Sequence, residues 1–511
     1  MKVPQNLKQF VTDGLAYLRR KPDIGDAEIF ASVNTIATCR INYTSHIPCN
    51  GLEEPKSLQT QGVGLRLAFT NGSGIKIGFG QETGSLTVEG VEAAYRKARE
   101  GAVFDPDFHG LPDQPPSEAS LRDYHDPLLL SLSDAHLVDV GWKTINGALE
   151  ELERSPLLRA HSPASLGVIL GGDVTLLQEE MAVASTRLAT PEDDTSTLLF
   201  ASLTAMIETM NGKGSGWSAE TRLAGFDGAA GGMAVRNALR VSGGGVRVAS
   251  GTYPVVLAPQ AVADIMSHIV VPSLRLDTFF AGYSAFQGKL GAQVASEKLF
   301  VHDSGNDRNL TASKGITCEG LPTGETELIA GGRLVGLLSN DYETKRMLHD
   351  GKARDKLGVD PHDWAHAIAP RNGFRFGQGG GRHHAALPSI SPTNMVIDGA
   401  QPASLDAMLA MVKNGVYVGR IWYTYPINGI KAGDFTATVV GDSFMIRDGR
   451  LAEPLQPNSV RIDDSIHSVL HRIMAIEDKR TGIVLWAADE MFYAPHMAVD
   501  GLTLSAIGAS S

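Results

Sequence analysis

The stretch from Gly251 to His268 reads GTYPVVLAPQAVADIMSH and contains two patterns in succession. Its first part, YPVVLAP, is rich in β-branched apolar residues and predicts a strand. Beyond Pro259 the apolar residues recur at helical spacing as far as Asp277, which predicts a helix. One histidine, His268, lies in the middle of that helix. The question is whether the helix carries a catalytic metal or only forms a wall of the core.

Composition limits the classes of protein to which the chain can belong. With 511 residues, the chain is too long for one core, and two or more domains are expected. A net charge of −12 without a Lys/Arg block argues against nucleic-acid binding. Three cysteines without a CxxC pair favour a reducing compartment. No signal peptide and no apolar run of membrane-spanning length are evident, so a cytoplasmic location is expected.

The first half of the chain alternates between helical and extended patterns. Apolar residues at helical spacing predict a first helix over 7–18, and a long helix over 134–154 has Ser133 as its N-cap. The remaining patterns predict strands over 27–33, 35–43, 62–70, 74–80, 165–185 and 195–209, a hairpin turn at 71–73 and a helix over 88–102. This half is therefore expected to be an α+β domain with an antiparallel sheet.

A glycine-rich passage over 211–232 separates the halves, and 233–244 follows as a short connecting helix. We place the boundary between about Gly212 and Gly251, which gives domains 1–230 and 231–511. The second half is expected to be a mixed or antiparallel β-rich domain with helices. Its predicted elements are a hairpin over 325–339, a loop-rich zone over 351–392, strands over 416–425, 434–441 and 443–454, and helices over 404–415 and 463–478.

Several motifs, in order and spacing, resemble the TldD/PmbA family, in which PmbA is also called TldE and which is also known as modulator of DNA gyrase. They are GTYPVVLAPQAVADIMSH, GYSAFQGKLGAQVASEKLFVHD, GDSFMIRDGRLAEPL and, near the C-terminus, APHMAVDGLTLSAIG. The hairpin GVGLRLAFTNGSG and the helix ending in AREGAVFDPDFHGLP match the N-terminal plan. The resemblance covers nearly the whole chain.

The resemblance implies a zinc peptidase complex made of two kinds of subunit. TldD-type subunits carry an H-E-x-x-x-H motif on the metal helix and a cysteine near the C-terminus, whereas PmbA-type subunits lack these ligands. In the segment over 259–276, Ser267 stands at the first histidine, His268 at the glutamate and Pro272 at the second histidine. No cysteine occurs over 482–501. The chain therefore resembles the PmbA/TldE side, with no catalytic residue and no metal ligand of its own.

A second histidine pair offers an alternative metal site. His362 and His366 lie four residues apart in VDPHDWAHAIAP, a spacing that places two imidazoles on one face of a helix. Asp360 could cap that short helix, and His383 or His384 could supply a third ligand. No glutamate follows His362, so H-E-x-x-H is not matched, and an exposed short helix is the simpler interpretation.

The glycine-rich stretch FRFGQGGGRHHAALPS, over 374–389, is the remaining candidate. Glycines allow close approach of a ligand, and arginine binds carboxylates. We expect a substrate-facing or partner-facing role for Arg375, Arg382, His383 and His384, as for His268, the alternative being a plain surface loop. Ser284 has no G-x-S-x-G context, and Cys39, Cys49 and Cys318 have no visible histidine partner.

These observations lead to one leading hypothesis and two alternatives. In the first, the chain is a PmbA/TldE-like subunit that pairs with a zinc-bearing TldD-like subunit and presents unfolded peptide for maturation or degradation. In the second, it is an enzyme by itself, with a metal relocated to His362, His366 and His383 or His384. In the third, it is a homodimeric peptide-binding protein. Whether the chain by itself is an enzyme stays open at this stage.

Overall fold

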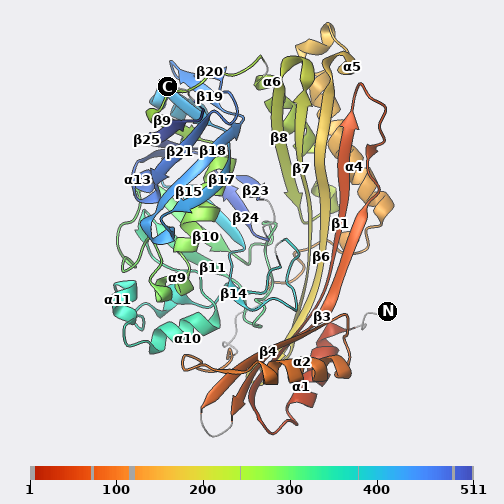
Figure 1. The fold of residues 1–511 in the computed structure, drawn as a ribbon, viewed down its shortest axis with the longest axis vertical. Coiled ribbons are helices and arrows are strands. Elements are labelled where there is room, and N and C mark those ends of the chain that lie inside the picture. Colours follow the sequence, from red (N-terminus) through yellow and green to blue (C-terminus); the bar gives the residue numbers. More distant parts are fainter. Residues whose placement is uncertain are drawn as a thin grey trace.

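The structure is a computed structural model that describes residues 6–70, 74–113, 121–241, 243–377, 379–485 and 489–508. The hairpin turn expected at 71–73 lies outside the described residues. Long strands of the N-terminal half form an arched sheet along one side of the molecule, and the C-terminal half packs on the other side (Figure 1). The expected α+β class is confirmed, with antiparallel pairing in the first half and mixed pairing in the second.

The N-terminal sheet is built around one long central strand. The extended patterns over 27–33 and 35–43, expected as two strands, form a single strand that pairs with β3 on one side and β6 on the other. The sheet has eight strands in the order β5-β4-β3-β1-β6-β7-β8, with β2 attached to β1. Its strands are β1 Ile24–Thr44, β2 Gly51–Leu52, β3 Lys56–Thr70, β4 Ile75–Thr83, β5 Val103–Phe104, β6 Val168–Ser185, β7 Glu192–Ile207 and β8 Gly212–Glu220.

Amphipathic helices cover this sheet and bury their apolar stripes against it. One core lies between the sheet and α4 and α6, and another between the sheet and α1 and α2. The predicted first helix and the Ser133 cap are confirmed, since the Ser133 hydroxyl accepts a hydrogen bond from the His136 amide. The helical segments are α1 Leu7–Leu18, α2 Val88–Glu100, α3 Pro127–Leu130, α4 Asp134–Glu153, η1 Pro156–Arg159, α5 Pro163–Leu166, η2 Glu208–Met210, η3 Leu223–Gly225 and α6 Ala229–Arg240.

The glycine-rich passage over 211–232 contains a strand and the start of a helix. Its first part is β8, the last strand of the sheet, and its glycines allow α6 to pack directly on that strand. A Cβ atom at Gly216 would lie 1.9 Å from the carbonyl oxygen of Ala230, and one at Gly214 would lie 2.2 Å from the Ala238 amide nitrogen. Close packing therefore explains these glycines better than turn formation does. The division into domains 1–230 and 231–511 stays a prediction.

The C-terminal half contains a nine-stranded sheet and a six-stranded sheet that share the largest apolar core of the described residues. The nine-stranded sheet comprises β9 Gly251–Leu257, β16 Gly415–Val418, β17 Arg420–Ile427, β18 Asp434–Gly441, β19 Phe444–Arg447, β20 Arg450–Pro454, β21 Val460–Ser465, β22 Ile473–Ile476 and β25 Met497–Ala506. The six-stranded sheet comprises β10 Leu299–Ser304, β11 Glu325–Ala330, β12 Arg333–Leu334, β15 Asn394–Gly399, β23 Thr481–Val484 and β24 Met491–Ala494; β13 Gly373–Phe374 and β14 Ser389–Ile390 form a small hairpin pair.

The prediction of one long helix in this half is wrong. Over 463–478 only the six residues of α13 are helical, because the flanking residues join strands β21 and β22 of the sheet. Tertiary pairing thus overrides a local helical pattern. The helical segments of this half are α7 Pro259–Ile265, η4 Met266–Val270, α8 Val271–Ser273, α9 Leu276–Ala281, α10 Asp341–His349, α11 Ala353–Leu357, η5 Ala365–Ile368, α12 Leu405–Val412, η6 Ile430–Ala432 and α13 Ile466–His471.

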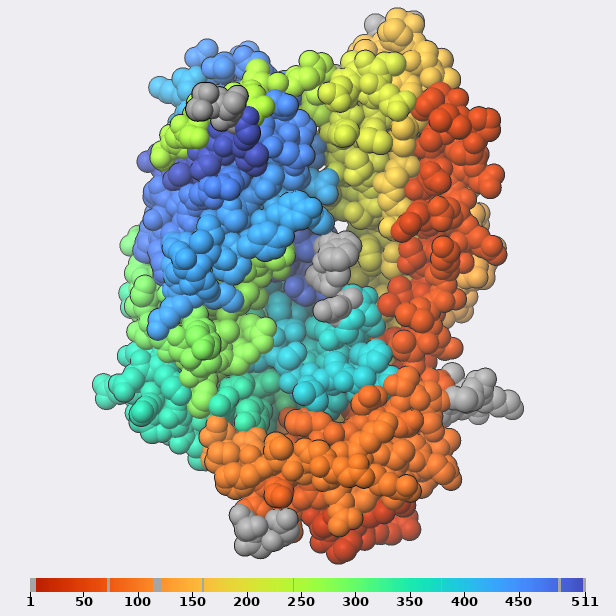
Figure 2. Space-filling view, in the orientation of Figure 1, coloured from red at the N-terminus to blue at the C-terminus, as the bar shows by residue number. Residues whose placement is uncertain are grey.

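The segment between β10 and β15 ties the two halves together. Side chains from 314–319 and 372–384 contact residues of β1, β3, β6 and β7. Figure 2 shows the cyan surface of this segment lying directly against the red and orange strands. Among the described residues, no helix is both long and apolar enough to cross a membrane.

Candidate functional site

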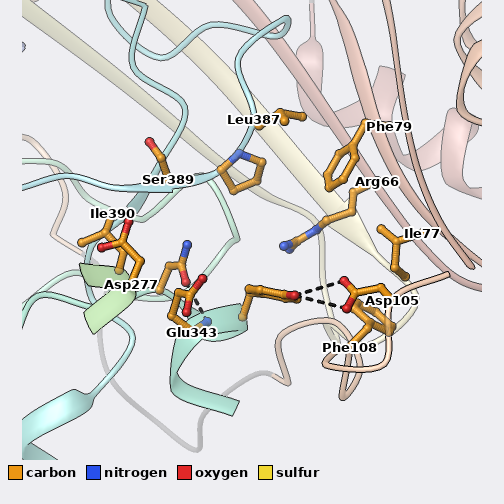
Figure 3. Close-up of a pocket in the computed structure, with 13 residues that line it drawn as sticks. Arg66, Ile77, Phe79, Asp105, Phe108, Asp277, Glu343, Leu387, Ser389 and Ile390 are labelled. Atoms are coloured by element: carbon orange, nitrogen blue, oxygen red, sulfur yellow. Dashed lines mark hydrogen bonds between the residues drawn. The ribbon is translucent and has the colours of Figure 1, made fainter. Parts of the chain in front are cut away.

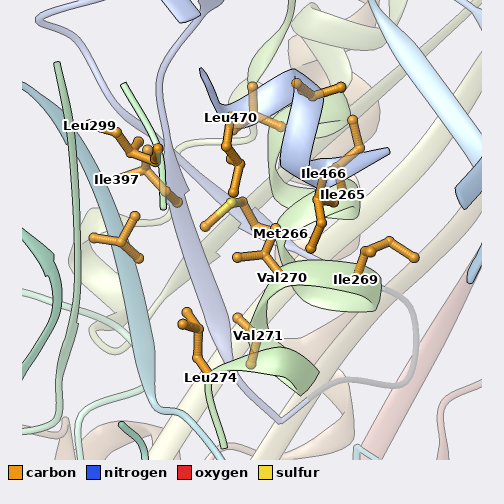
Figure 4. Close-up of a cluster of buried hydrophobic side chains, with 14 of the residues drawn as sticks. Ile265, Met266, Ile269, Val270, Val271, Leu274, Leu299, Ile397, Ile466 and Leu470 are labelled. Atoms are coloured by element: carbon orange, nitrogen blue, oxygen red, sulfur yellow. The ribbon is translucent and has the colours of Figure 1, made fainter. Parts of the chain in front are cut away.

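The helical segment from Pro259 to Ser273 is mostly a wall of the core. Pro259 occupies its first turn, where a missing N–H is tolerated. The apolar residues of the helix pack against strands of both sheets and against α13, as Figure 4 shows for Met266, Val270 and Leu470. Pro272 has no N–H to donate to the carbonyl four residues earlier. Just before it, over Met266–Val270, the helix forms a wider π-helical turn. Such turns are frequent at functional sites.

His268 is an exposed ionisable side chain of the helix, and its Nδ1 atom contacts Asp264. Its Nδ1 lies 3.0 Å from the carbonyl oxygen of Asp264 and 3.3 Å from the Asp264 carboxylate. The hydrogen bond with Asp264 raises the pKa of His268, against the effect of burial. Asp264 itself is buried and accepts a hydrogen bond from the Gln260 amide. This chain of contacts fixes the imidazole ring and favours its charged form.

The same chain of contacts reaches the edge strand of the nine-stranded sheet. Gln260 accepts a hydrogen bond from the Ile421 amide at 3.0 Å and donates one to the Ile421 carbonyl at 3.2 Å. A cavity of about 310 Å³ lies beyond this contact, between Asp264 and His268 on the helix and residues 422–425 of β17. The helix therefore presents one imidazole to a cavity beside edge strand β17.

The strand side of this cavity is aromatic and irregular. The pairing of β17 with β18 is interrupted between Trp422 and Tyr425, and Tyr423 has a φ of 55°. A left-handed backbone at a bulky residue stores strain and often marks a functional position. Tyr423 and Tyr425 are exposed, whereas the buried hydroxyl of Thr424 has no hydrogen-bond partner in the described structure.

These residues do not fit a zinc ion. A catalytic zinc needs three protein ligands converging on one point with an open position for water. Here the helix offers one imidazole, that of His268, and its one carboxylate, that of Asp264, is already bonded to Gln260. Within the described residues, no group of three or more His, Cys, Asp or Glu side chains is arranged to hold a metal.

The glycine-rich loop carries a second set of charged residues, and Arg382 anchors it. The Arg382 guanidinium lies 3.1 Å from the Glu179 carboxylate and 2.7 Å from the Asp194 carboxylate. Lys314 lies 2.8 Å from the same oxygen of Glu179, and Tyr124 donates to Asp194 at 2.7 Å. We call these five buried residues the Glu179 cluster. Burial alone would raise the pKa of Glu179, but the charges of Arg382 and Lys314 hold it well below the ordinary value.

Arg375 belongs to a second buried group, which includes Glu28 on β1 and Arg66 on β3. It lies 2.8 Å from the Glu28 carboxylate, which is also 2.5 Å from Arg66. Arg66 is shared with Glu319, at 3.3 Å, and Glu319 accepts from the Asp341 amide at 3.0 Å. We call these five residues the Glu319 cluster. Burial and the nearby carboxylates of Asp341 and Glu28 raise the pKa of Glu319 to about 7.

The structure corrects the exposure that was expected for this loop. Arg375, Arg382 and His384 are almost fully buried instead of facing solvent, because partners on the N-terminal sheet enclose them. His384 bonds to Thr83 at 2.9 Å, and burial lowers its pKa to about 4. His383 stacks on His384 and is half-buried. A contact of any of these residues, or of the exposed His268, with a peptide or a partner stays a prediction.

The alternative metal site is not assembled. The segment over 361–364 forms a turn, with its Asp360 side chain accepting from the His362 amide, and a 3₁₀ helix begins only at Ala365. The expected helix that would align His362 and His366 is therefore absent from this described segment. His366 instead stacks on Trp364, and His383 stacks on His384.

The serine and the cysteines considered in the sequence have structural surroundings. The buried Ser284 hydroxyl donates to the Ser273 carbonyl at 2.6 Å. Cys39 and Cys318 are buried free thiols, and Cys49 is an exposed one. Burial raises the pKa of Cys318 to about 12, which disfavours a nucleophilic thiolate.

Sequence reasoning missed the partners that give these residues their surroundings. Asp264 could have been found, since it stands one helical turn before His268. Glu28 and Glu179 lie in predicted strands, but both strands contain other polar residues, so the sequence did not single these two out as buried. Nothing local could have identified Thr424 or the strained Tyr423, because both depend on the pairing of β17 with β18.

Comparison with known proteins identifies a matching family and several relatives of this chain. A model of the PmbA/TldA metallopeptidase C-terminal domain matches residues 250–506. The metalloprotease slr0863 of Synechocystis is 25% identical over 228 residues, which are 44% of this chain and 42% of that protein. A TldD homologue of Haemophilus influenzae, also named a metalloprotease, is 26% identical over 251 residues, 48% of this chain and 45% of that protein. The matches thus span under half the length of these relatives.

Solved structures with the same fold cover nearly the whole chain. TldE from Thermococcus kodakarensis superposes with a TM-score of 0.73 at 16% identity, covering 97% of this chain and 99% of that one. A protein of Thermotoga maritima described as a modulator of DNA gyrase gives a TM-score of 0.71 at 16% identity, covering 98% of this chain and 100% of that one. At these identities the likeness establishes the fold, whereas the match over 250–506 establishes the family. The chain belongs to the PmbA/TldD metallopeptidase family.

Proposed function

We propose that this chain is the PmbA/TldE-like subunit of a cytoplasmic peptidase complex that acts on unfolded peptides. In this proposal it holds peptide beside the helix at 259–273, while a TldD-like partner carries the zinc and performs hydrolysis. The chain's own residues bind and orient, and none of them serves as a metal ligand, base or nucleophile.

The observation that carries the proposal is the side-chain set of that helix. In the region where the family's metal helix is expected, the chain presents one imidazole, and the nearest carboxylate is buried and hydrogen-bonded. Fewer than three ligands cannot hold a catalytic zinc. The fold around the helix is nevertheless intact, which favours a role in binding over a role in hydrolysis.

The surroundings of the helix suit an extended peptide. Edge strand β17 has one side without a neighbouring strand in the described sheet, and peptides add to such edges through backbone hydrogen bonds that require little sequence specificity. Tyr423 and Tyr425 offer exposed aromatic surface beside it. The imidazole of His268, whose raised pKa favours the cation, can pair with a carboxylate of the peptide.

Metal analysis of the chain alone and of the chain co-expressed with an H-E-x-x-x-H partner tests the proposal. We expect stoichiometric zinc and cleavage of an unfolded peptide from the pair, and neither from the chain alone. His268→Ala in this chain should leave the zinc content of the pair unchanged and raise its KM. His467→Ala, a change at a histidine of α13, serves as the matched control and should alter neither quantity.

Two outcomes would replace the proposal. About one zinc per isolated chain, lost on His366→Ala, would establish the alternative of an enzyme that works alone. A stable homodimer that binds unfolded peptide and captures no zinc-bearing partner would establish the third hypothesis.

A further inference from the structure

A second cavity, of about 320 Å³, lies where the N-terminal sheet meets the C-terminal half. It shares no lining residue with the cavity beside His268. One side is formed by β3, β4 and the segment after β5, and the other by α10 and the residues leading into β14. Figure 3 shows side chains from both sides pointing into the same space.

One wall of this cavity is apolar. Ile77, Phe79 and Phe108 line it from the N-terminal side, and Leu387 lines it from the opposite loop. Phe79 is 42% exposed and Leu387 is 55% exposed, so two large apolar side chains remain in contact with water around this space. Burying them against an apolar ligand would be favourable.

Three carboxylates line the cavity, and they differ in how far they are neutralised. Asp277 pairs with Arg275 at 2.6 Å, and Glu343 pairs with Arg346 at 3.4 Å. The Asp105 carboxylate is instead held by neutral groups: the Tyr342 hydroxyl, at 3.2 and 3.1 Å from its two oxygens, and the Asp107 amide, at 3.0 Å. Asp105 is therefore the carboxylate best placed to receive a cation from outside.

A buried arginine that has one unpaired donor also lines the cavity. Arg66 is 5% exposed, lines the cavity and points into it in Figure 3. Its two terminal nitrogens are taken by Glu28 and Glu319, but its Nε–H has no hydrogen-bond partner in the described structure. An unpaired buried donor is unfavourable, and a ligand oxygen would relieve it.

We propose that this cavity binds the amino terminus of a peptide whose first residue is apolar. The terminal ammonium group contacts Asp105, the first carbonyl oxygen accepts from Arg66 Nε–H, and the first side chain packs on Phe79 and Leu387. This inference stands apart from the proposed subunit role, because it concerns a different cavity and does not require a zinc-bearing partner.

The carboxyl groups that Arg66 contacts favour binding of a peptide over binding of a free amino acid. Arg66 already contacts the carboxyl groups of Glu28 and Glu319, so a further carboxylate beside it would be repelled by Glu28, and by Glu319 wherever Glu319 is ionised. A neutral peptide carbonyl provides the acceptor without that repulsion. Free phenylalanine, which carries a carboxylate at this position, should therefore bind more weakly than a peptide that begins with phenylalanine.

Calorimetric titration of the full chain at about pH 6.5, where an α-amino group is protonated, tests the proposal. The probes are Phe-Gly-Gly amide, its N-acetylated form and free phenylalanine. We expect saturable binding of the first at one site per chain, and binding at least about tenfold weaker for the other two, because acetylation removes the ammonium group and free phenylalanine adds a carboxylate.

Two variants connect that binding to this cavity. Asp105→Asn should weaken binding of the tripeptide amide by about tenfold or more. The matched control is Asp107→Asn, because this neighbouring carboxylate pairs with Arg346 and does not line the cavity. Phe79→Ala, a change at a half-exposed side chain, should also weaken binding and leaves the buried ion pairs untouched.

The proposal fails if the acetylated probe binds as tightly as the free amine, or if Asp107→Asn weakens binding as much as Asp105→Asn does. Tighter binding of free phenylalanine would assign the cavity to amino acids instead of peptides. Absence of any saturable binding would also overturn it. None of these results bears on zinc content, so they can be told apart from failure of the proposed function.

Discussion

The Glu179 cluster and the Glu319 cluster fasten the same loop to the same sheet, but their charges are balanced differently. Glu179 contacts two cations, Arg382 and Lys314, so its carboxylate stays ionised in the interior. Glu319 shares its one arginine with Glu28 and lies close to Asp341, and its pKa rises to about 7. The number of cations per carboxylate, more than burial, therefore decides which buried acid keeps its charge.

The largest expected effect comes from Arg382→Ala in the Glu179 cluster. This change leaves Glu179 with Lys314 alone and removes the cation that contacts Asp194. Uncompensated buried charges of this kind destabilise a fold by about 3–5 kcal/mol. Urea unfolding at pH 7 measures the loss, and Arg447→Ala, which breaks an exposed ion pair with Glu453, should leave the unfolding curve nearly unchanged.

Arg66→Ala in the Glu319 cluster should destabilise the fold less than Arg382→Ala. Glu28 keeps Arg375, and Glu319 can take up a proton instead of remaining charged. We expect a loss of about 1–3 kcal/mol, typical of a buried group that loses a hydrogen-bonded partner. Equal losses for the two arginine variants in the same urea experiment would remove the distinction between the clusters.

The pH dependence of stability should separate the clusters next. The folded-state pKa of Glu319, about 7, exceeds its ordinary value of 4.5, so the folded protein holds this proton more tightly than the unfolded chain does. Stability is therefore lost as pH rises from about 4.5 to about 7, by at most about 1.4 kcal/mol per pH unit. Glu319→Gln should abolish that slope in urea unfolding measured from pH 5 to 8.

Glu179→Gln provides the control for this pH series. Its folded-state pKa is lowered, so the stability due to its charge is present above pH 4.5 and is lost only as pH falls below that value. The effect of this substitution should stay constant between pH 5 and 8. A pH slope that vanishes in the Glu179 variant and persists in the Glu319 variant would reverse the assignment.

The smallest expected effect concerns the thiol that lies between the two clusters. Cys318 accepts a hydrogen bond from the Arg375 amide at 3.2 Å and has a pKa of about 12, whereas the exposed Cys49 has a lowered pKa because its thiolate accepts hydrogen bonds from backbone amides. In native protein, alkylation followed by mass spectrometry should label Cys49 first and Cys318 only on unfolding. Arg382→Ala should speed labelling of Cys318 without changing that of Cys49.

Elements with strong local signals could be predicted from the sequence. The spacing of apolar residues and the cap at Ser133 were sufficient for α1 and α4, because the interactions that start a helix lie within one turn. The same reasoning failed at β8, where glycines serve close packing with α6, and around α13, where strand pairing overrode the helical pattern. Both failures arise where a distant segment decides the local structure.

The candidate site divides in the same way. The sequence by itself determined the residue types of the helix at 259–273, which include one histidine and no glutamate or cysteine. Only the tertiary structure decided that Arg375 and Arg382 are buried, since their carboxylate partners lie 347 and 203 residues away in the chain. Residue identity fixes which chemistry a side chain can perform, whereas long-range packing fixes whether it faces a ligand or another side chain.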